Sequence, residues 1–141
     1  EGVFLEEKYT GANFHFRTTD ETDNLNDDNP LLGHTVYLKG NATLDDRTVS
    51  FSALLDVPVG TEMIGAVFNL EITEQTEGLL LFQIFTTDPS EGDTMFDGLD
   101  FALLDDDNDD VVNIIPGDSA HNILMKTVIS HDHYGVNFVT E

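Results

Sequence analysis

The sequence predicts an all-β fold, a single antiparallel β-sandwich or jelly-roll-like domain of about nine or ten strands over residues 1–141. Apolar and polar residues alternate along most of the chain, which is the period of a strand with one buried face. Turn signals separate the runs, and the four prolines fall between them, where a sheet tolerates proline: Pro30, Pro58, Pro89 and Pro116. A length of 141 residues suits one domain with its own core.

The clearest prediction is a hairpin formed by residues 34–44 and 47–56. Asp45-Asp46 separates the two runs and predicts a short turn. The apolar residues that share the inner face are Val36, Leu38, Ala42, Leu44, Val49, Phe51, Ala53 and Leu55.

Residues 62–72 and 78–87 predict the next two strands. The first run alternates, although Glu62–Gln75 also permits a helix. The second run is apolar on both faces, which indicates a central strand covered on both sides. Its apolar residues are Leu79, Leu80, Leu81, Phe82, Ile84 and Phe85.

Six further strands are expected, at residues 3–9, 12–18, 99–104, 111–115, 120–129 and 133–139. Met95, Leu99 and Leu103 also lie at helical spacing, so a short helix is the alternative there. The apolar segment Gly2–Leu5 is expected to pair with its own sheet or with an open edge of a neighbouring subunit.

Charge excludes several function classes. The chain has 28 Asp and Glu against five Lys and Arg, a formal net charge of -23. Nucleic-acid phosphates and anionic membranes repel such a chain, and no apolar run approaches the roughly 20 residues that span a bilayer. We therefore expect no nucleic-acid partner and no membrane insertion.

The acidic residues are clustered. Between Arg47 and Lys126 there is no Lys or Arg, and ten acidic residues lie between Asp88 and Asp110. Neighbouring carboxylates repel one another, so these clusters favour a bound cation.

The sharpest cluster is the segment Asp105–Asp110. Alternate loop carboxylates can converge on calcium, which takes about six to eight oxygen ligands. The segment is not an EF-hand, because Asp110 stands where the sixth loop position needs Gly and Pro116 stands where the twelfth needs Glu. We expect Ca²⁺ as the cofactor, with the ligands Asp105, Asp107, Asp109, Asp110, Asp93 and Asp97. The alternative is a solvated acidic loop without an ion.

Two other acidic stretches are weaker candidates. The first could fold back towards Asp105–Asp110 and complete a metal shell: Asp88, Glu91, Asp93, Asp97 and Asp100. The second has residue types that also populate ordinary turns: Asp20, Glu21, Asp23, Asn24, Asn26, Asp27, Asp28 and Asn29. For each stretch, a polar loop is the alternative to a metal site.

The histidine pair His131 and His133 is expected to be exposed, because Tyr134, Val136 and Phe138 take the opposite, apolar face. A zinc or copper site needs a third ligand, and none is evident from spacing. We expect neither catalysis nor a tightly bound transition metal there.

No catalytic pattern stands out. The five serines lie outside any nucleophile-elbow context, Cys is absent, and no Gly-rich phosphate loop occurs. Trp is absent and Tyr occurs three times, which disfavours an aromatic platform for sugars. Asn41-Ala42-Thr43 is a glycosylation triplet, so a glycan at Asn41 is expected if the chain is exported.

Together these features favour a non-catalytic extracellular or cell-surface structural subunit of a fibre, surface layer or matrix. It would bind calcium through acidic loops and self-assemble through sheet edges or exchange of a terminal strand. The first alternative is a calcium-dependent module that binds carbohydrate or a cell surface. The second is a small halophilic protein whose acidity serves solvation only. The chain begins at Glu1 rather than Met, which we interpret as a processed product or a fragment.

Overall fold

The computed structural model describes residues 5–74, 76–130 and 133–140. The fold is mostly β, with 40% strand and 14% helix, so the predicted fold class is correct at this coarse level. The strands are β1 (Lys8–His15), β2 (Val36–Leu44), β3 (Arg47–Leu55), β4 (Glu62–Glu71), β5 (Gly78–Ile84), β6 (Val111–Ile114) and β7 (Tyr134–Thr140). The helices are η1 (Glu21–Asp23), α1 (Phe101–Leu104) and α2 (Ser119–Val128).

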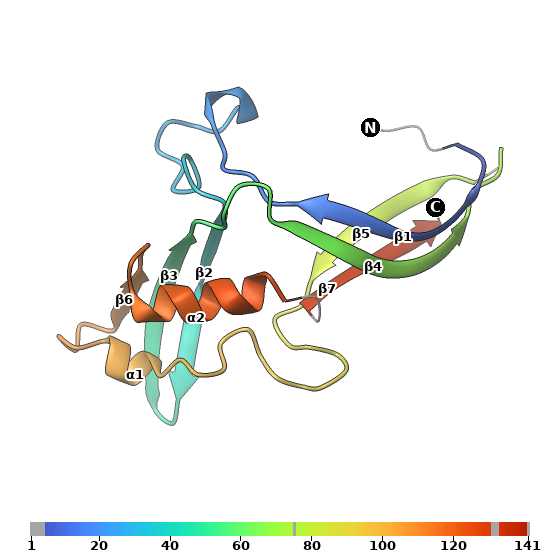
Figure 1. Cartoon of the computed structure of the whole chain (residues 1–141). Coiled ribbons are helices and arrows are strands. Elements are labelled where there is room, and N and C mark those ends of the chain that lie inside the picture. The colour runs from blue at the N-terminus through green and yellow to red at the C-terminus, as the bar shows by residue number, and fades with distance from the viewer. Residues whose placement is uncertain (1–4, 75, 131–132, 141) are drawn as a thin grey trace.

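The strands form three small sheets rather than one sandwich of nine or ten strands. One sheet has the order β2-β3-β6, and the others are the two-stranded ribbons β1-β4 and β5-β7 (Figure 1). Alternation identified most of the strands, but it carries no information on which strands pair. No helix among the described residues is both long enough and apolar enough to cross a membrane.

The predicted hairpin is confirmed as β2 and β3. Its antiparallel register runs from Val36 opposite Leu55 to Leu44 opposite Arg47, so Asp45 and Asp46 alone make the turn. Asp45 takes a φ of 52°, a left-handed conformation that Asp tolerates better than most residues. β6 lies parallel to β3 on its other side, which the antiparallel prediction missed.

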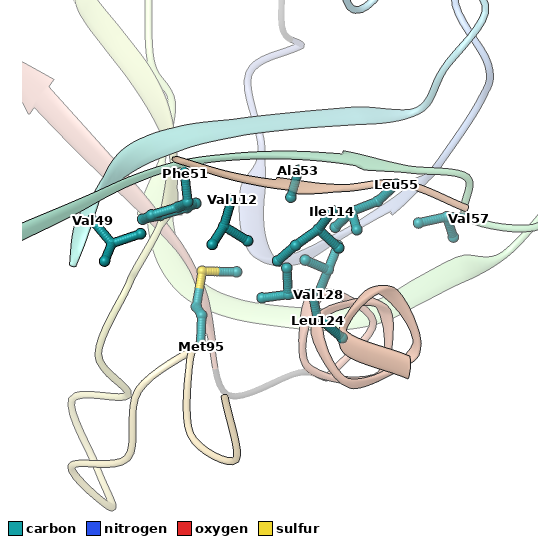
Figure 2. Packing of buried hydrophobic residues seen from close by; sticks show 11 residues of the cluster. Val49, Phe51, Ala53, Leu55, Val57, Met95, Val112, Ile114, Leu124 and Val128 are labelled. Atoms are coloured by element: carbon teal, nitrogen blue, oxygen red, sulfur yellow. The ribbon is translucent and has the colours of Figure 1, made fainter. Parts of the chain in front are cut away.

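The core lies between this three-stranded sheet and α2 (Figure 2). β3 contributes four alternate buried residues, Val49, Phe51, Ala53 and Leu55, and β6 adds Val112 and Ile114. Residues 120–129 were predicted as a strand, and this prediction is wrong. Ala120, Leu124 and Val128 are spaced four apart, so α2 buries them along one face.

The strand predicted at 99–104 is also wrong, and its helical alternative is correct for residues 101–104. The side chain of Asp100 accepts hydrogen bonds from the N–H groups of Ala102 and Leu103, which caps α1. The strand predicted for 62–72 is confirmed as β4, so the helical alternative there is excluded.

The two ribbons lie side by side (Figure 1), and aromatic rings from both of them are in contact. The ring of Phe14 in β1 lies 4.6 Å from that of Phe82 in β5 and 5.1 Å from that of Tyr134 in β7. In place of the two strands predicted at 3–9 and 12–18, the structure has one strand, β1 (Lys8–His15), whose register with β4 shifts twice. The segment Gly2–Phe4 lies outside the described residues, and the Glu7 carbonyl already accepts a bond from the N–H of Ile72 after β4.

β5 is a strand, as predicted, but it is not a covered central strand. Among the described strands it pairs with β7 alone. Its apolar side chains remain substantially exposed: Leu79 57%, Leu81 39%, Phe82 49% and Ile84 53%.

Candidate metal centre

The loop between α1 and β6 brings three predicted ligands together. Carboxylate oxygens of Asp105, Asp107 and Asp109 lie within 4.8 Å of one another. Asn108 and Asp110 adopt left-handed φ angles of 59° and 63°, which tighten the loop. The alternate spacing in the sequence therefore produces convergent oxygens, the arrangement that calcium requires.

Asp105 holds this loop closed. Its side chain is fully buried and accepts hydrogen bonds from the N–H groups of Asp109 at 3.1 Å and Asp110 at 3.0 Å. The guanidinium of Arg47 donates to the same carboxylate. Three donors satisfy this buried carboxylate, so it fixes the loop in place.

Arg47 also pairs with Asp110, whose Oδ1 lies 2.8 Å from Nε. This hydrogen bond is the main reason that the pKa of Arg47 is raised. Asp110, a predicted ligand, is therefore directed to Arg47 and is not among the three converging carboxylates. Arg47 pairs with both Asp105 and Asp110, so its single positive charge offsets one of their two negative charges, and among the described residues Asp106, Asp107 and Asp109 have no ion-pair partner.

The carboxylates of Asp107 and Asp109 repel one another. The negative charge of Asp109 is the main cause that raises the pKa of Asp107, with burial next. A divalent cation between these carboxylates would remove that repulsion. The electrostatics of the loop therefore favour a cation at the same point to which the oxygens converge.

A second group of converging carboxylates lies in the loop after β5. Oxygens of Asp88, Glu91 and Asp93 lie within 4.8 Å of one another. Asp88 is buried and accepts hydrogen bonds from the N–H and the hydroxyl of Ser90 at 2.6 and 2.7 Å. The hydroxyl bond is the main cause that lowers the pKa of Asp88.

The structure separates the other two predicted ligands. Asp93 belongs to this second group, whereas Asp97 accepts bonds from the N–H and hydroxyl of Thr94 at 3.2 and 2.8 Å. The two groups are distinct, so the expectation that they complete one shell is not met by this arrangement.

The third acidic stretch has local structural roles. Asp20 accepts bonds from the N–H and hydroxyl of Thr22 and so caps η1. Asp23 pairs with the guanidinium of Arg17. Among the described acids of this stretch, none forms a third converging group.

His133 is buried, so its predicted exposure is wrong. Its Nδ1 lies 2.8 Å from the Phe85 carbonyl oxygen, and its own carbonyl accepts from the Phe85 N–H. Strand alternation does not apply here because β7 begins only at Tyr134. His131 lies outside the described residues.

A hollow of about 720 Å³ lies between the tip of the β2–β3 hairpin and α1. Sequence reasoning missed this feature, because it depends on how α1 packs against the hairpin. Its lining includes Ala42, Leu44, Arg47, Val49, Leu99 and Phe101. Asn41, in the glycosylation triplet, is exposed nearby on β2 and accepts a hydrogen bond from Ser50 at 3.0 Å.

No protein-family model, curated protein or solved structure matches this chain. The function is therefore argued from the residues of the site itself.

Proposed function

We propose that this protein is a non-catalytic structural subunit of an extracellular assembly, and that Ca²⁺ binds its loop Asp105–Asp110. The observation that carries the proposal is the convergence of the Asp105, Asp107 and Asp109 carboxylates on a loop that Arg47 and two backbone N–H groups hold closed. A preformed loop loses little conformational entropy when the ion binds.

The donor set favours calcium over other metals. All three donors are carboxylate oxygens, which suit hard cations, and the chain has no Cys to select zinc or copper. Calcium accepts irregular oxygen arrangements on a loop, whereas magnesium demands near-octahedral geometry. Further ligand positions would be filled by water or backbone oxygens.

The histidines support a role other than catalysis. His34 pairs with Asp56 at 2.8 Å, and the N–H of Asp56 lies 3.5 Å from Nε2 of the buried His121. His133 is bound to the Phe85 carbonyl. Three imidazoles, the commonest general bases, are therefore engaged in contacts that connect elements of the fold.

The hollow beside the hairpin favours a second candidate, a calcium-dependent module that binds carbohydrate or a cell surface. Arg47 lines this hollow and also pairs with Asp105 and Asp110 of the loop. An ion in the loop and a ligand in the hollow would then be coupled through one side chain.

A thermal melt in EDTA and in millimolar calcium, at constant ionic strength, tests the calcium site. A ligand at one hundred times its Kd stabilises the folded state by about 2.7 kcal/mol, so calcium should raise the midpoint. Asp107→Asn should remove most of the shift, whereas Glu74→Gln, which removes an exposed charge outside the loop, should preserve it. An unchanged midpoint in calcium would contradict the site. A requirement for molar salt without preference for calcium would favour the halophilic alternative.

A further inference from the structure

The ribbon β5–β7 is free of charge in a strongly acidic protein. Neither Gly78–Ile84 nor Tyr134–Thr140 contains an Asp, Glu, Lys or Arg, although the whole chain has 28 acids in 141 residues. At that frequency the fourteen residues of the two strands would contain about three acids. This ribbon is therefore an uncharged surface on a molecule of net charge -23.

β5 has the residues of an interior strand and the position of an edge strand. A run that is apolar on both faces is typical of a strand whose two faces are both covered, and an exposed edge strand more often carries charge. Among the described strands, however, β5 pairs with β7 alone, and Leu79, Phe82 and Ile84 are about half exposed. No described strand pairs with the other side of β5, so its backbone groups there form an open ladder that another strand can join.

Three other edge strands, β1, β2 and β6, have protective features that β5 lacks. The register of β1 shifts twice, β2 presents the exposed Lys39, and β6 has only four residues. Bulges, lysines and short length each hinder pairing between molecules. β5 pairs with β7 in continuous register over seven residues, without proline or charge.

We propose that β5 is a self-association edge, and that a second copy of this chain joins it through its own β5 in antiparallel orientation. The inference rests on the proposed self-assembling role and names the edge used. A two-fold axis at Leu81 would pair Gly78 with Ile84 of the second copy and Leu81 with its own equivalent. The result is a four-stranded sheet, β7-β5-β5-β7, in which both β5 strands are interior.

Electrostatics favour a second copy over a charged partner at this edge. The seven residues of β5 that would pair carry no charge, and the nearest acids, Glu77 and Asp88, lie outside them. The acidic loop between α1 and β6 lies at the opposite end of the molecule from the ribbon (Figure 1). The residual repulsion between two acidic molecules is screened by salt, so association should strengthen as NaCl increases.

Sedimentation of the wild type, Leu81→Lys and a control variant tests the edge. Two lysines at position 81 would face each other, so Leu81→Lys should weaken association at least about tenfold. Leu44→Lys, at an exposed apolar position on β2, should leave association unchanged. Leu79→Lys is the second variant if Leu81→Lys does not fold.

The absence of Cys from the chain permits a direct test of register. Opposed Cα atoms in antiparallel strands are about 4.5–5.5 Å apart, within the range that a disulfide bridges. Leu81→Cys should therefore form disulfide-linked dimers under mild oxidation, and Leu44→Cys should not.

The outcomes separate this inference from the proposed function. If the wild type associates and Leu81→Lys associates equally well, the β5 edge is wrong and the structural role stands. If the wild type stays monomeric with and without calcium at high salt, both the edge and the self-assembling role are overturned, whatever the melts show for the metal site.

Discussion

Asp105→Ala, measured without an ion, tests which side chain closes the acidic loop. The substitution removes the buried acceptor of the Asp109 and Asp110 N–H groups and of the Arg47 guanidinium. Hydrogen bonds to a charged group contribute about 1.5–3 kcal/mol each when buried. Asp109 and Asp110 are exposed, so their released N–H groups can bind water. The loss of stability is therefore smaller than the summed contributions of the three hydrogen bonds. We expect a loss of about 2–3 kcal/mol in the free energy of unfolding.

The assay is thermal unfolding followed by circular dichroism in EDTA, so that no ion contributes. For a domain of this size, the expected loss corresponds to a fall of roughly 6–12 °C in the midpoint. Asp106→Ala, at an exposed position of the same loop, is the matched control and should change the midpoint little. An Asp105→Ala midpoint equal to that of the wild type would refute the argument that this carboxylate holds the loop.

Three other predictions follow from the geometry. Leu124→Ala empties a fully buried position between α2 and the sheet and should lower the free energy of unfolding by about 2–5 kcal/mol; a urea-denaturation loss below 1 kcal/mol would contradict this core. His133→Ala leaves the Phe85 carbonyl without its side-chain partner and should lower the free energy of unfolding by about 1–3 kcal/mol. An unchanged free energy of unfolding in urea would argue against that hydrogen bond. The raised pKa of Asp107 means that the folded state binds this proton more tightly than the unfolded state, so stability is gained as pH falls through the raised pKa. In EDTA at neutral pH, the unfolding midpoint of Asp107→Asn should therefore be higher than that of the wild type, and the two midpoints should be equal well below pH 3.8. In calcium at neutral pH, the wild type should have the higher midpoint. The same order of midpoints with and without calcium would count against the site.

Local patterns predicted the hairpin and most other strands because their signals lie within a few residues. Asp45-Asp46 between two alternating runs was sufficient for β2 and β3. The spacing of Ala120, Leu124 and Val128 also carried a helical signal, with Pro116-Gly117 before it, but alternation was given precedence. In this segment the helical spacing of the buried residues outweighs the alternation expected of a strand.

Other features depend on contacts between distant residues. Arg47 reaches Asp105 and Asp110 across 58 and 63 positions, and it can do so because β6 lies parallel to β3 with Ser50 opposite Val111. Nothing local in the sequence specifies that pairing. The alternate spacing therefore predicted that Asp105, Asp107 and Asp109 converge. It did not predict that Asp110 would pair with Arg47.

The exposure of β5 is a further case in which sequence and structure differ. The apolar character of both faces predicted neighbours on both sides, and within one chain β5 has a neighbour on one side among the described strands. Self-association through this edge would give β5 a strand neighbour on its second side.

Calorimetric titration of calcium into the metal-free protein tests the central claim most directly. Affinities of extracellular calcium modules lie at about 10⁻⁴–10⁻³ M, so the titration should extend to roughly 10 mM. We expect saturable, stoichiometric calcium binding that Asp107→Asn abolishes and Glu74→Gln preserves. Absence of binding over that range, or equal binding by Asp107→Asn, would contradict a calcium site on the loop Asp105–Asp110.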